Sequence, residues 1–256
     1  MEKVLVYLSV IYKGDWDKIY EAILNKQPID KKDLEKILNT VTDNYITLLN
    51  SNYPDSLKQI FKPPFVLFYK GNLSLLNERV KIAVIGSRNN SEYGKEVTET
   101  ICKDLITKGN VTIVSGLAKG ADSIAHKTCI NENGKTIAVL ANGLNITYPK
   151  ENNCLYKQIA EKGLILTEYP SDIMPDPKNF LSRNRIIAGI SNGVIVTEAK
   201  TKSGTMNTVS HALEAGKQIF CVPDKLNTNS GCNKLIKEGA KLIENADDVL
   251  EEYIMD

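Results

Sequence analysis

The chain has 256 residues, of which 42% are hydrophobic and 25% are charged, and this ordinary globular composition excludes a mainly disordered protein. Its 32 basic and 31 acidic residues give a formal net charge of +1, so any nucleic-acid site must be a local patch. At this length we expect one large core with a small appendage.

Arginine is used sparingly and in few places. Three of the four arginines, Arg88, Arg183 and Arg185, fall in two short segments, and Arg79 stands apart. In a chain that otherwise uses lysine, arginine indicates positions where a planar fork of donors matters, as in phosphate contact or base stacking. The alternative is that these arginines anchor salt bridges.

The cysteines and the N-terminus indicate a cytoplasmic protein without a metal site. The five cysteines are scattered and lack CxxC spacing, which argues against both a disulfide framework and zinc. We expect them to be small buried hydrophobic residues in a reducing compartment. The apolar stretch at the N-terminus is too short to span a bilayer and lacks a cleavage site, so no membrane association is expected.

Residues 1–42 are predicted to form a small helical module. Apolar residues recur at three- and four-residue intervals from Val4 to Leu38, with Pro28 and Asp30 as punctuation. A strand-rich bridge follows, consisting of YITLLN and PPFVLFYKGN with turn signals on either side of the second run. We therefore place a core domain over residues 43–256.

After Arg79 the sequence alternates between short apolar runs and polar, helix-patterned stretches. The runs are KIAVIG, VTIVSG, KTIAVLANG, LILTEY, GVIVTEA and QIFCVP, and a seventh, KLIEN, leads into the closing helix DDVLEEY. Runs that are apolar on both faces and separated by helices are typical of parallel strands. They predict an α/β fold with a doubly wound, mainly parallel sheet, whose ligand-binding loops follow the strands along one edge.

The first of these loops, Gly86, Ser87 and Arg88, enters a helix that Ser91 can cap. Glycine permits close backbone approach, and the helix start offers unpaired N–H groups to an anion, so the loop is a candidate phosphate site. It is not the dinucleotide fingerprint GxGxxG, because Arg88 stands where the second glycine is needed. No segment matches GxxxxGK[ST], which disfavours a P-loop nucleotide hydrolase.

The second loop contains Ser115, Gly116, Lys119 and Asp122 between a strand and a helix. Two readings of Ser115 and Gly116 stay open, namely a ligand contact and a tight turn in which Asp122 caps the helix. For Lys119 we favour a ligand contact.

The third loop runs into Pro149 and Lys150 before a helix. A lysine near the positive end of a helix opposes the dipole unless an anion is bound there, so Lys150 is a candidate phosphate contact. The two histidines, His126 and His211, fall inside helical patterns and are expected to be structural residues rather than bases.

The fourth loop carries the most informative residues. It places Phe180 among Lys178, Arg183, Asn184 and Arg185, which is the combination typical of a single-strand site. In such sites cations contact the backbone, and a ring or a guanidinium stacks on a base.

Helical spacing separates the two arginines of this segment. Arg183 and Arg185 lie on different faces of a helix, so we expect that only one of them points inward. The other could pair with Glu168 or Glu198, which stand at neighbouring strand ends. The fifth loop adds Ser203, Gly204 and Thr205, which suit another anion-binding helix start.

Taken in order, a series of motifs resembles the DNA-processing protein A family, also called DprA or Smf, from about Tyr53 to Ala240. They are VIGSR, IVSGLAKGAD, GLNITYPKEN, TEYP, NFLSRNRIIAG, EAKTKSGTMNT and CVP followed by GCNKLI. The SRNRIIAG block is specific in itself.

The resemblance implies an extended Rossmann-like core that binds single-stranded DNA without cleaving it and without a cofactor. It further implies a homodimer that helps to load the RecA recombinase in natural transformation or recombination. Carried over by motif, the strand-binding residues are Gly86, Ser87, Arg88, Ser115, Gly116, Lys119, Lys150, Lys178, Phe180, Arg183 and Asn184. Two departures concern the ends of the chain: the C-terminal winged helix of many relatives is not expected here, and the N-terminal module lacks a clear helix-hairpin-helix glycine turn.

Two other functions stay open. A related family of nucleotide phosphoribohydrolases resembles the chain in its late Gly-Thr loop, and Glu198 would then be the catalytic acid. Against this, the chain has Lys-Ser-Gly-Thr where that family has a glycine-rich motif, and no catalytic pair of carboxylates stands out. The third possibility is an interaction scaffold whose dimer face is the helix from Asn207 to Ala215.

Overall fold

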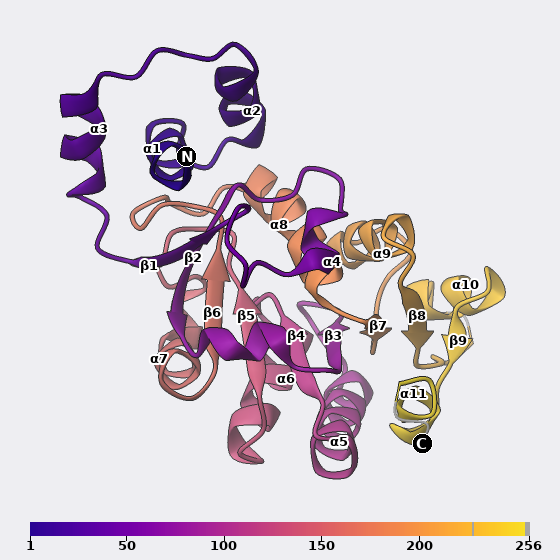
Figure 1. Cartoon of the computed structure of the whole chain (residues 1–256). Helices are drawn as coiled ribbons and strands as arrows, with labels where there is room; N and C mark the ends of the chain where they lie inside the picture. Colours follow the sequence, from indigo (N-terminus) through magenta and orange to yellow (C-terminus); the bar gives the residue numbers. More distant parts are fainter. Residues whose placement is uncertain (227, 254–256) are drawn as a thin grey trace.

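The computed structural model describes residues 1–226 and 228–253 (Figure 1). The N-terminal helices are α1 (Glu2–Ile11), α2 (Trp16–Leu24) and α3 (Lys31–Leu38), as the apolar spacing predicts. The remaining helices are α4 (Asp55–Lys58), η1 (Leu73–Asn77), α5 (Glu92–Gly109), α6 (Ala121–Asn131), η2 (Lys150–Asn152), α7 (Asn153–Lys162), α8 (Pro177–Ile190), α9 (Gly204–Glu214), α10 (Gly231–Lys237) and α11 (Asp247–Leu250).

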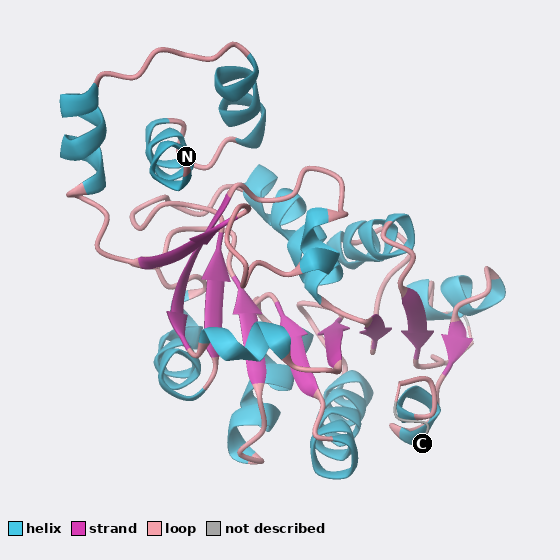
Figure 2. Ribbon diagram, in the orientation of Figure 1, coloured by secondary structure: helices cyan, strands magenta, loops and turns pink. Residues whose placement is uncertain are grey.

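Within these residues nine strands form one sheet in the order β1-β2-β6-β5-β4-β3-β7-β8-β9 (Figure 2). The strands are β1 (Asn44–Thr47), β2 (Val66–Gly71), β3 (Lys81–Ile85), β4 (Thr112–Ser115), β5 (Thr136–Val139), β6 (Leu164–Thr167), β7 (Gly193–Val196), β8 (Gln218–Cys221) and β9 (Lys241–Leu242). The strands from β3 to β9 pair in parallel, whereas β1 and β2 are antiparallel to their neighbours. This confirms the predicted extended Rossmann-like, doubly wound and mainly parallel sheet.

The direction of the chain reverses at β3. From β3 the chain builds β4, β5 and β6 outward on one side, and it returns to place β7 on the other side of β3. In open parallel sheets the loops diverge at such a reversal and leave a crevice at the carboxyl ends of the strands. The residues that follow β3 and β7 are therefore placed where this fold binds ligands.

Helices cover both faces of the sheet. On one face α4, α8, α9 and α10 pack on the strands around a core that includes Leu57, Ile187 and Val209. On the other face α5, α6 and α11 pack on β3, β4, β7 and β8, around Leu105 and Phe220. Because both faces are covered, β4, β5, β6 and β7 are buried along their whole length and are mainly apolar, which is the pattern from which the strands were predicted.

The N-terminal helices have a small apolar cluster of their own around Leu8 and Ile19. Leu5 and Val6 of α1 also pack with β2 and α7, so the helices are docked on the sheet. Gly14, with a φ of 75°, lies so close to Glu168 and Tyr169 that a Cβ atom would meet them at 2.8 to 2.9 Å. The turn between α1 and α2 thus sits at the carboxyl end of β6, and the division into domains at residue 42 stays a prediction.

Two further expectations concern cysteines and membranes. All five cysteines are free, and four are buried as expected, but Cys154 is exposed on α7, so the expectation of burial is wrong for that residue. Within the described residues, none of the helices combines the length and the apolar character needed to cross a membrane.

Candidate nucleic-acid interface

A cavity of about 380 Å³ lies at the carboxyl ends of β3 and β7. It is lined by the loop after β3, the first half of α8 and the segment from Lys200 to Thr208. The structure thereby brings together these predicted site residues: Gly86, Ser87, Arg88, Phe180, Arg183, Asn184, Ser203, Gly204 and Thr205. The segments that meet here are far apart in the sequence, and they lie together because β3 and β7 are neighbours in the sheet.

Phe180 lies close to two guanidinium groups at the cavity wall. The guanidinium carbon of Arg88 is 5.3 Å from the centre of the Phe180 ring, and that of Arg183 is 6.0 Å from it. Tyr148, which is 47% exposed, packs against the same ring with a centroid distance of 5.5 Å. Cations within about 6 Å of an aromatic face are attracted to it, so the two arginines help to fix the ring.

Arg183 is 3% exposed, so it forms the inner wall of the cavity rather than a flexible surface contact. Its guanidinium donates to the carbonyls of Gly116, at 2.7 Å, and Val139. Burial lowers the pKa of Arg183 to about 10, and the Asp122 carboxylate opposes that shift. At neutral pH the side chain therefore remains a buried cation.

The positions of Gly116 and Asp122 explain how this cation is accommodated. A Cβ atom on Gly116 would lie 2.5 to 2.6 Å from three atoms of the Arg183 guanidinium, so only glycine leaves room for it. Asp122 accepts hydrogen bonds from the backbone N–H groups of Gly116 and Ala118, at 3.1 and 3.3 Å. Asp122 thus holds the loop in a tight turn. Burial raises the pKa of the Asp122 carboxyl, and the nearby Arg183 guanidinium opposes that shift.

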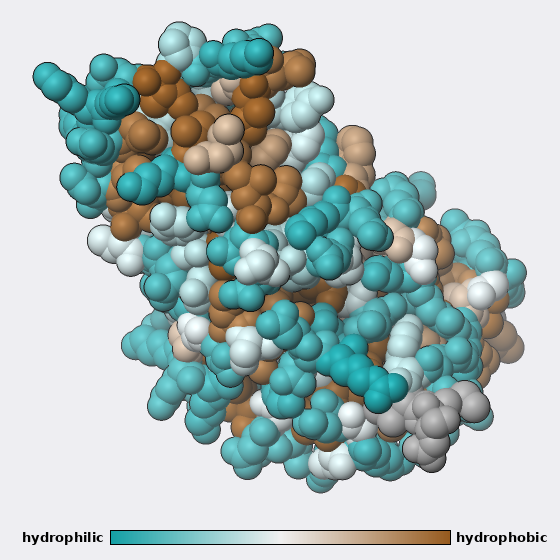
Figure 3. Space-filling model, in the orientation of Figure 1, coloured by the Kyte–Doolittle hydropathy of each residue, from teal (hydrophilic) through white to brown (hydrophobic). Residues whose placement is uncertain are grey.

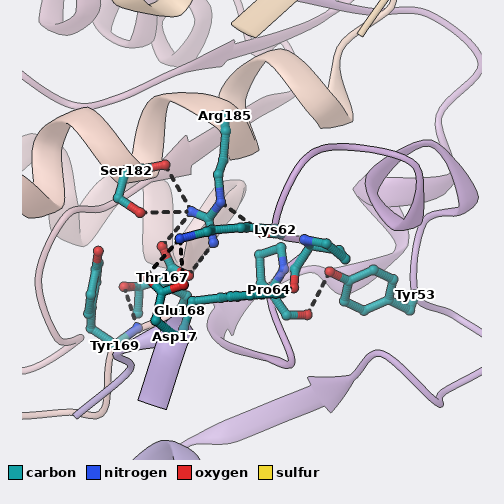
Figure 4. Close-up of polar contacts among 11 residues, drawn as sticks. Asp17, Tyr53, Lys62, Pro64, Thr167, Glu168, Tyr169, Ser182 and Arg185 are labelled. Carbon is teal, nitrogen blue, oxygen red and sulfur yellow. Dashed lines mark hydrogen bonds and ion pairs between the residues drawn. The ribbon is translucent and has the colours of Figure 1, made fainter. Parts of the chain in front are cut away.

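The expectation that only one arginine of α8 points inward is wrong, because Arg183 and Arg185 are 3% and 4% exposed. Helix α8 is covered on both sides, so the two faces are both buried. Arg185 forms the predicted pair with Glu168 through two hydrogen bonds of 2.7 and 2.6 Å, and its Nε donates to the Lys62 carbonyl at 2.9 Å (Figure 4). Arg185 therefore anchors the helix and takes no part in the cavity.

The start of α9 opens into the cavity. Ser203 is the residue before the helix, and its hydroxyl donates to the Lys200 carbonyl at 2.9 Å rather than capping the helix. Thr205 donates to the Gly86 carbonyl at 3.0 Å, which joins α9 to the loop after β3. Among the described residues no side chain caps this helix start, and the binding of an anion there stays a prediction.

The start of α5, predicted as a phosphate site, is already occupied by a carboxylate of the chain. Glu198 accepts from the backbone N–H and the hydroxyl of Ser91, both at 3.0 Å. Its Oε2 lies where a Cβ atom of Gly94 would be. The prediction of an open anion site at α5 is wrong for this reason. Glu198 does not line the cavity within the described residues, which removes support for its role as a catalytic acid.

Five predicted site residues do not line the cavity within the described part of the chain: Ser115, Gly116, Lys119, Lys150 and Lys178. Ser115 is fully buried at the end of β4, where its hydroxyl donates to the Val84 carbonyl at 2.7 Å. Lys119 is exposed and paired with Glu151 at 2.7 Å, a contact that raises its pKa. Lys150 and Lys178 are exposed at the starts of η2 and α8.

Sequence reasoning missed several residues of the site. Lys200, Lys202 and Asn89 line the cavity, and Tyr148 supports Phe180. Each of them lies in a segment that was considered, but only the packing of the loops decides which side chain turns toward the cavity. A possible signal was the density of lysines just before the Ser-Gly-Thr helix start.

His126 has the expected structural character. His126 is fully buried, and its Nδ1 lies 2.7 Å from the Thr136 hydroxyl oxygen. Burial lowers its pKa to about 3, so it is neutral at physiological pH. Among residues 1–226 and 228–253, no group of three histidine, cysteine, aspartate or glutamate side chains is placed to hold a metal ion.

Comparison with known proteins adds an independent finding. The model of the family described as DNA recombination-mediator protein A matches residues 44–254. The chain is 44% identical over 211 residues to the DNA processing protein DprA of Bacillus subtilis, covering 82% of this chain and 71% of that protein. It is also 44% identical over 209 residues to DprA of Streptococcus pneumoniae, covering 81% and 73%.

Solved structures agree with this. The structure of DprA from Streptococcus pneumoniae has a TM-score of 0.82 at 40% identity and covers 94% of this chain and 83% of that one. The structure of DNA processing protein A from Helicobacter pylori, for which a single-stranded DNA binding mode has been described, has a TM-score of 0.75 at 35% identity. It covers 83% of this chain and 98% of that one.

Members of this family act in DNA processing and recombination. The strand order, the residues gathered at its carboxyl edge and these matches together make the chain a member of the DNA recombination-mediator protein A family, which includes the DNA-processing proteins DprA and Smf.

Proposed function

We propose that the cavity at the carboxyl ends of β3 and β7 binds single-stranded DNA without cleaving it. The observation that carries this proposal is the pairing of an aromatic ring with cations beside an open helix start: Phe180 lies against Arg88, and α9 begins across the same cavity. Single-strand sites combine a ring that stacks on a base with cations along the backbone.

Each part of the cavity suits one part of a nucleotide. Arg88, Lys200 and Lys202 are exposed and can contact phosphate oxygens, and the N–H groups at the start of α9 favour the same negative charge. Phe180 faces the cavity beside them and suits a base. Arg183 supports the Phe180 ring and is not expected to contact the DNA directly. It is buried, and its guanidinium already donates to acceptors on Gly116, Val139 and Asn184.

The single-stranded DNA binding mode described for the Helicobacter pylori relative supports this ligand. On the same basis we propose the finer roles that the family resemblance implies, which are dimerisation and the loading of RecA recombinase onto the bound strand during natural transformation or recombination. A protein that holds single strands by their backbone and bases, without cutting them, suits the delivery of intact DNA to a recombinase.

Fluorescence anisotropy with a labelled oligothymidine, repeated at several salt concentrations, tests the proposal. Contacts to about four to six phosphates predict a slope of roughly −3 to −4 in a plot of log affinity against log salt, at about −0.7 per phosphate. Duplex DNA of the same length serves as the competitor. An absence of binding at low salt would refute the proposal, whereas tighter binding to the duplex would show that the ligand is misassigned.

A further inference from the structure

A column of aromatic rings joins the N-terminal helices to the core. Trp16 of α2 stacks between Tyr20, with ring centres 5.0 Å apart and planes 12° apart, and Phe65, at 5.2 Å and 23°. Tyr20 is 46% exposed, so the column ends in a flat ring that faces solvent. Figure 3 shows hydrophobic side chains gathered over these helices.

Phe61 is linked to the column through Lys62. Phe61 is 70% exposed, which is unusual for so large an apolar side chain. The Lys62 ammonium lies 5.5 Å from the Phe61 ring centre and 5.4 Å from that of Trp16, and Asp17 pairs with it at 2.6 Å. We call Tyr20, Trp16, Phe61 and Phe65 the aromatic platform. Because Asp17 neutralises Lys62, the platform offers a ligand aromatic stacking rather than positive charge.

The loop beneath the aromatic platform is held rigidly to the core. Three consecutive carbonyls accept side-chain donors from separate elements: Lys62 from Arg185 at 2.9 Å, Pro63 from Trp16 at 2.7 Å and Pro64 from Tyr53 at 2.8 Å. Figure 4 shows Arg185 and Tyr53 reaching this loop from opposite sides. Since Arg185 belongs to α8, the platform is fixed to the helix that carries Phe180.

The aromatic platform and the cavity lie at the same edge of the sheet. Gly14, at the turn before Trp16, packs on Glu168 and Tyr169 at the carboxyl end of β6, and the cavity lies at the carboxyl ends of β3 and β7. Helix α8 contacts both, because Phe180 lines the cavity and Arg185 donates to the Lys62 carbonyl. A strand that leaves the cavity along this edge can therefore reach the platform without crossing the sheet.

Lys178 lies in the first turn of α8, the helix that contacts both sites. It does not line the cavity, it is exposed, and within the described residues it has no ion pair. By helical spacing it shares a face of α8 with Ser182 and Arg185, and this face meets the loop of the aromatic platform. An unpaired cation at this point suits a phosphate between two stacked bases.

We propose that the aromatic platform is a second stacking site for unpaired bases of the same DNA strand that occupies the cavity, with Lys178 contacting the phosphates between them. This inference rests on the proposed function. Flat parallel rings with one open face stack on any base, and such stacking is independent of sequence. The other possible occupant is a second copy of the chain, and the test below distinguishes the two.

The chain has one tryptophan, Trp16, which lies inside the column and reports on it directly. Oligothymidines of about four to twenty nucleotides, the range of common single-strand site sizes, are titrated while anisotropy and tryptophan emission are recorded. We expect short oligonucleotides to bind without changing the emission. Longer ones should bind more tightly and quench it.

Tyr20→Ala and Phe61→Ala should each remove about fivefold or more of the affinity for long oligonucleotides and leave short ones unaffected. The salt slope should not change, because no phosphate contact is lost, whereas Lys178→Ala should lower it for long oligonucleotides only. Leu24→Ala, which trims an aliphatic side chain 65% exposed on the same helix, is the matched control and should have no effect.

Three results would overturn the inference. The first is a tryptophan emission that no oligonucleotide changes. The second is an affinity of the Tyr20 and Phe61 variants for long oligonucleotides that equals the affinity of the parent protein. The third is a dimer in sedimentation that these variants convert to monomers. The last result would assign the platform to a second copy. A failure of all oligonucleotides to bind would instead refute the cavity as a DNA site, so the two proposals fail separately.

Discussion

Arg88 and Arg79 bracket β3, and only Arg88 lies at the carboxyl edge where the cavity forms. Arg88→Ala should weaken binding of oligothymidine and lower the salt slope by about 0.7, since one phosphate contact is removed. Arg79→Ala removes the same charge at the opposite end of the strand. Anisotropy at several salt concentrations checks both variants, and equal losses would mean that general charge, not the cavity, holds the DNA.

Gly116 and Gly204 form a second matched pair. Gly116→Ala places a methyl group against the Arg183 guanidinium and should destabilise the fold by about 1 to 3 kcal/mol. Gly204→Ala meets nothing within 4 Å and should leave stability unchanged or slightly raised. Urea denaturation gives both free energies of unfolding. If the two variants proved equally stable, Arg183 would not be confined as described.

His126 should make the fold sensitive to acid. Its pKa is lowered from 6.5 to about 3 by burial, so between these values the unfolded chain binds more protons than the folded one. Stability therefore falls as the pH drops below 6.5, by about 2 to 3 kcal/mol at pH 4.5, and is unaffected above pH 7. Urea denaturation of His126→Gln over this range should show a smaller loss than the parent. Parallel curves would contradict the prediction.

At the scale of elements, α8 unites anchoring and binding in a single helix. Arg185 faces Glu168 and the loop of Lys62, whereas Phe180, Arg183 and Asn184 line the cavity. The pair with Glu168 thus determines where the binding residues stand.

Glu168→Ala should destabilise the protein by about 3 to 5 kcal/mol, because it leaves Arg185 buried without a partner. Replacing both residues, as Glu168→Leu with Arg185→Met, removes the unpaired charge and should recover most of that loss. Thermal unfolding measures both. Should the double variant be as unstable as the single one, packing rather than charge would explain the effect.

The elements themselves were predictable, and their mutual arrangement was not. Runs such as KIAVIG and GVIVTEA are apolar on both faces, so they identify buried strands from local pattern alone. Whether α5 or α9 offers an open start depends on Glu198, which reaches Ser91 only because β7 lies beside β3. No local pattern encodes that adjacency, and the α5 site was predicted wrongly for this reason.

The arrangement of the elements also decides which of the candidate lysines reach the cavity. Lys178, Lys200 and Lys202 all lie at or just before helix starts, and only the last two line the cavity. Ser115 looked available because it follows an apolar run, but it is the last residue of β4 and is fully buried. Arginine scarcity was the better guide, since Arg88 and Arg183 were both located from it.

At the scale of the whole molecule, the net charge of +1 means that DNA is attracted by a local cluster and not by the overall field. Bound DNA should stabilise the folded chain by mass action. At about 100 times the dissociation constant the gain is about 2.7 kcal/mol, which corresponds to an increase in Tm of roughly 5 to 10 °C. Differential scanning fluorimetry with and without oligothymidine measures it, and Arg88→Ala should show a smaller shift at the same concentration.

The burial of α8 from Arg183 to Ile190 has an evolutionary consequence. One side packs on the sheet, another on α4 and the loop of Lys62, another on α9, and the first turns border the cavity. Because residues 183–190 are all buried, substitutions among them must be compensated by partners in other elements. The surface of α5 is exposed along much of its length, so its residues can change independently of other elements. Substitutions in α8 are instead expected to be accompanied by substitutions in the sheet, in α4 and the loop of Lys62, in α9 or at the cavity.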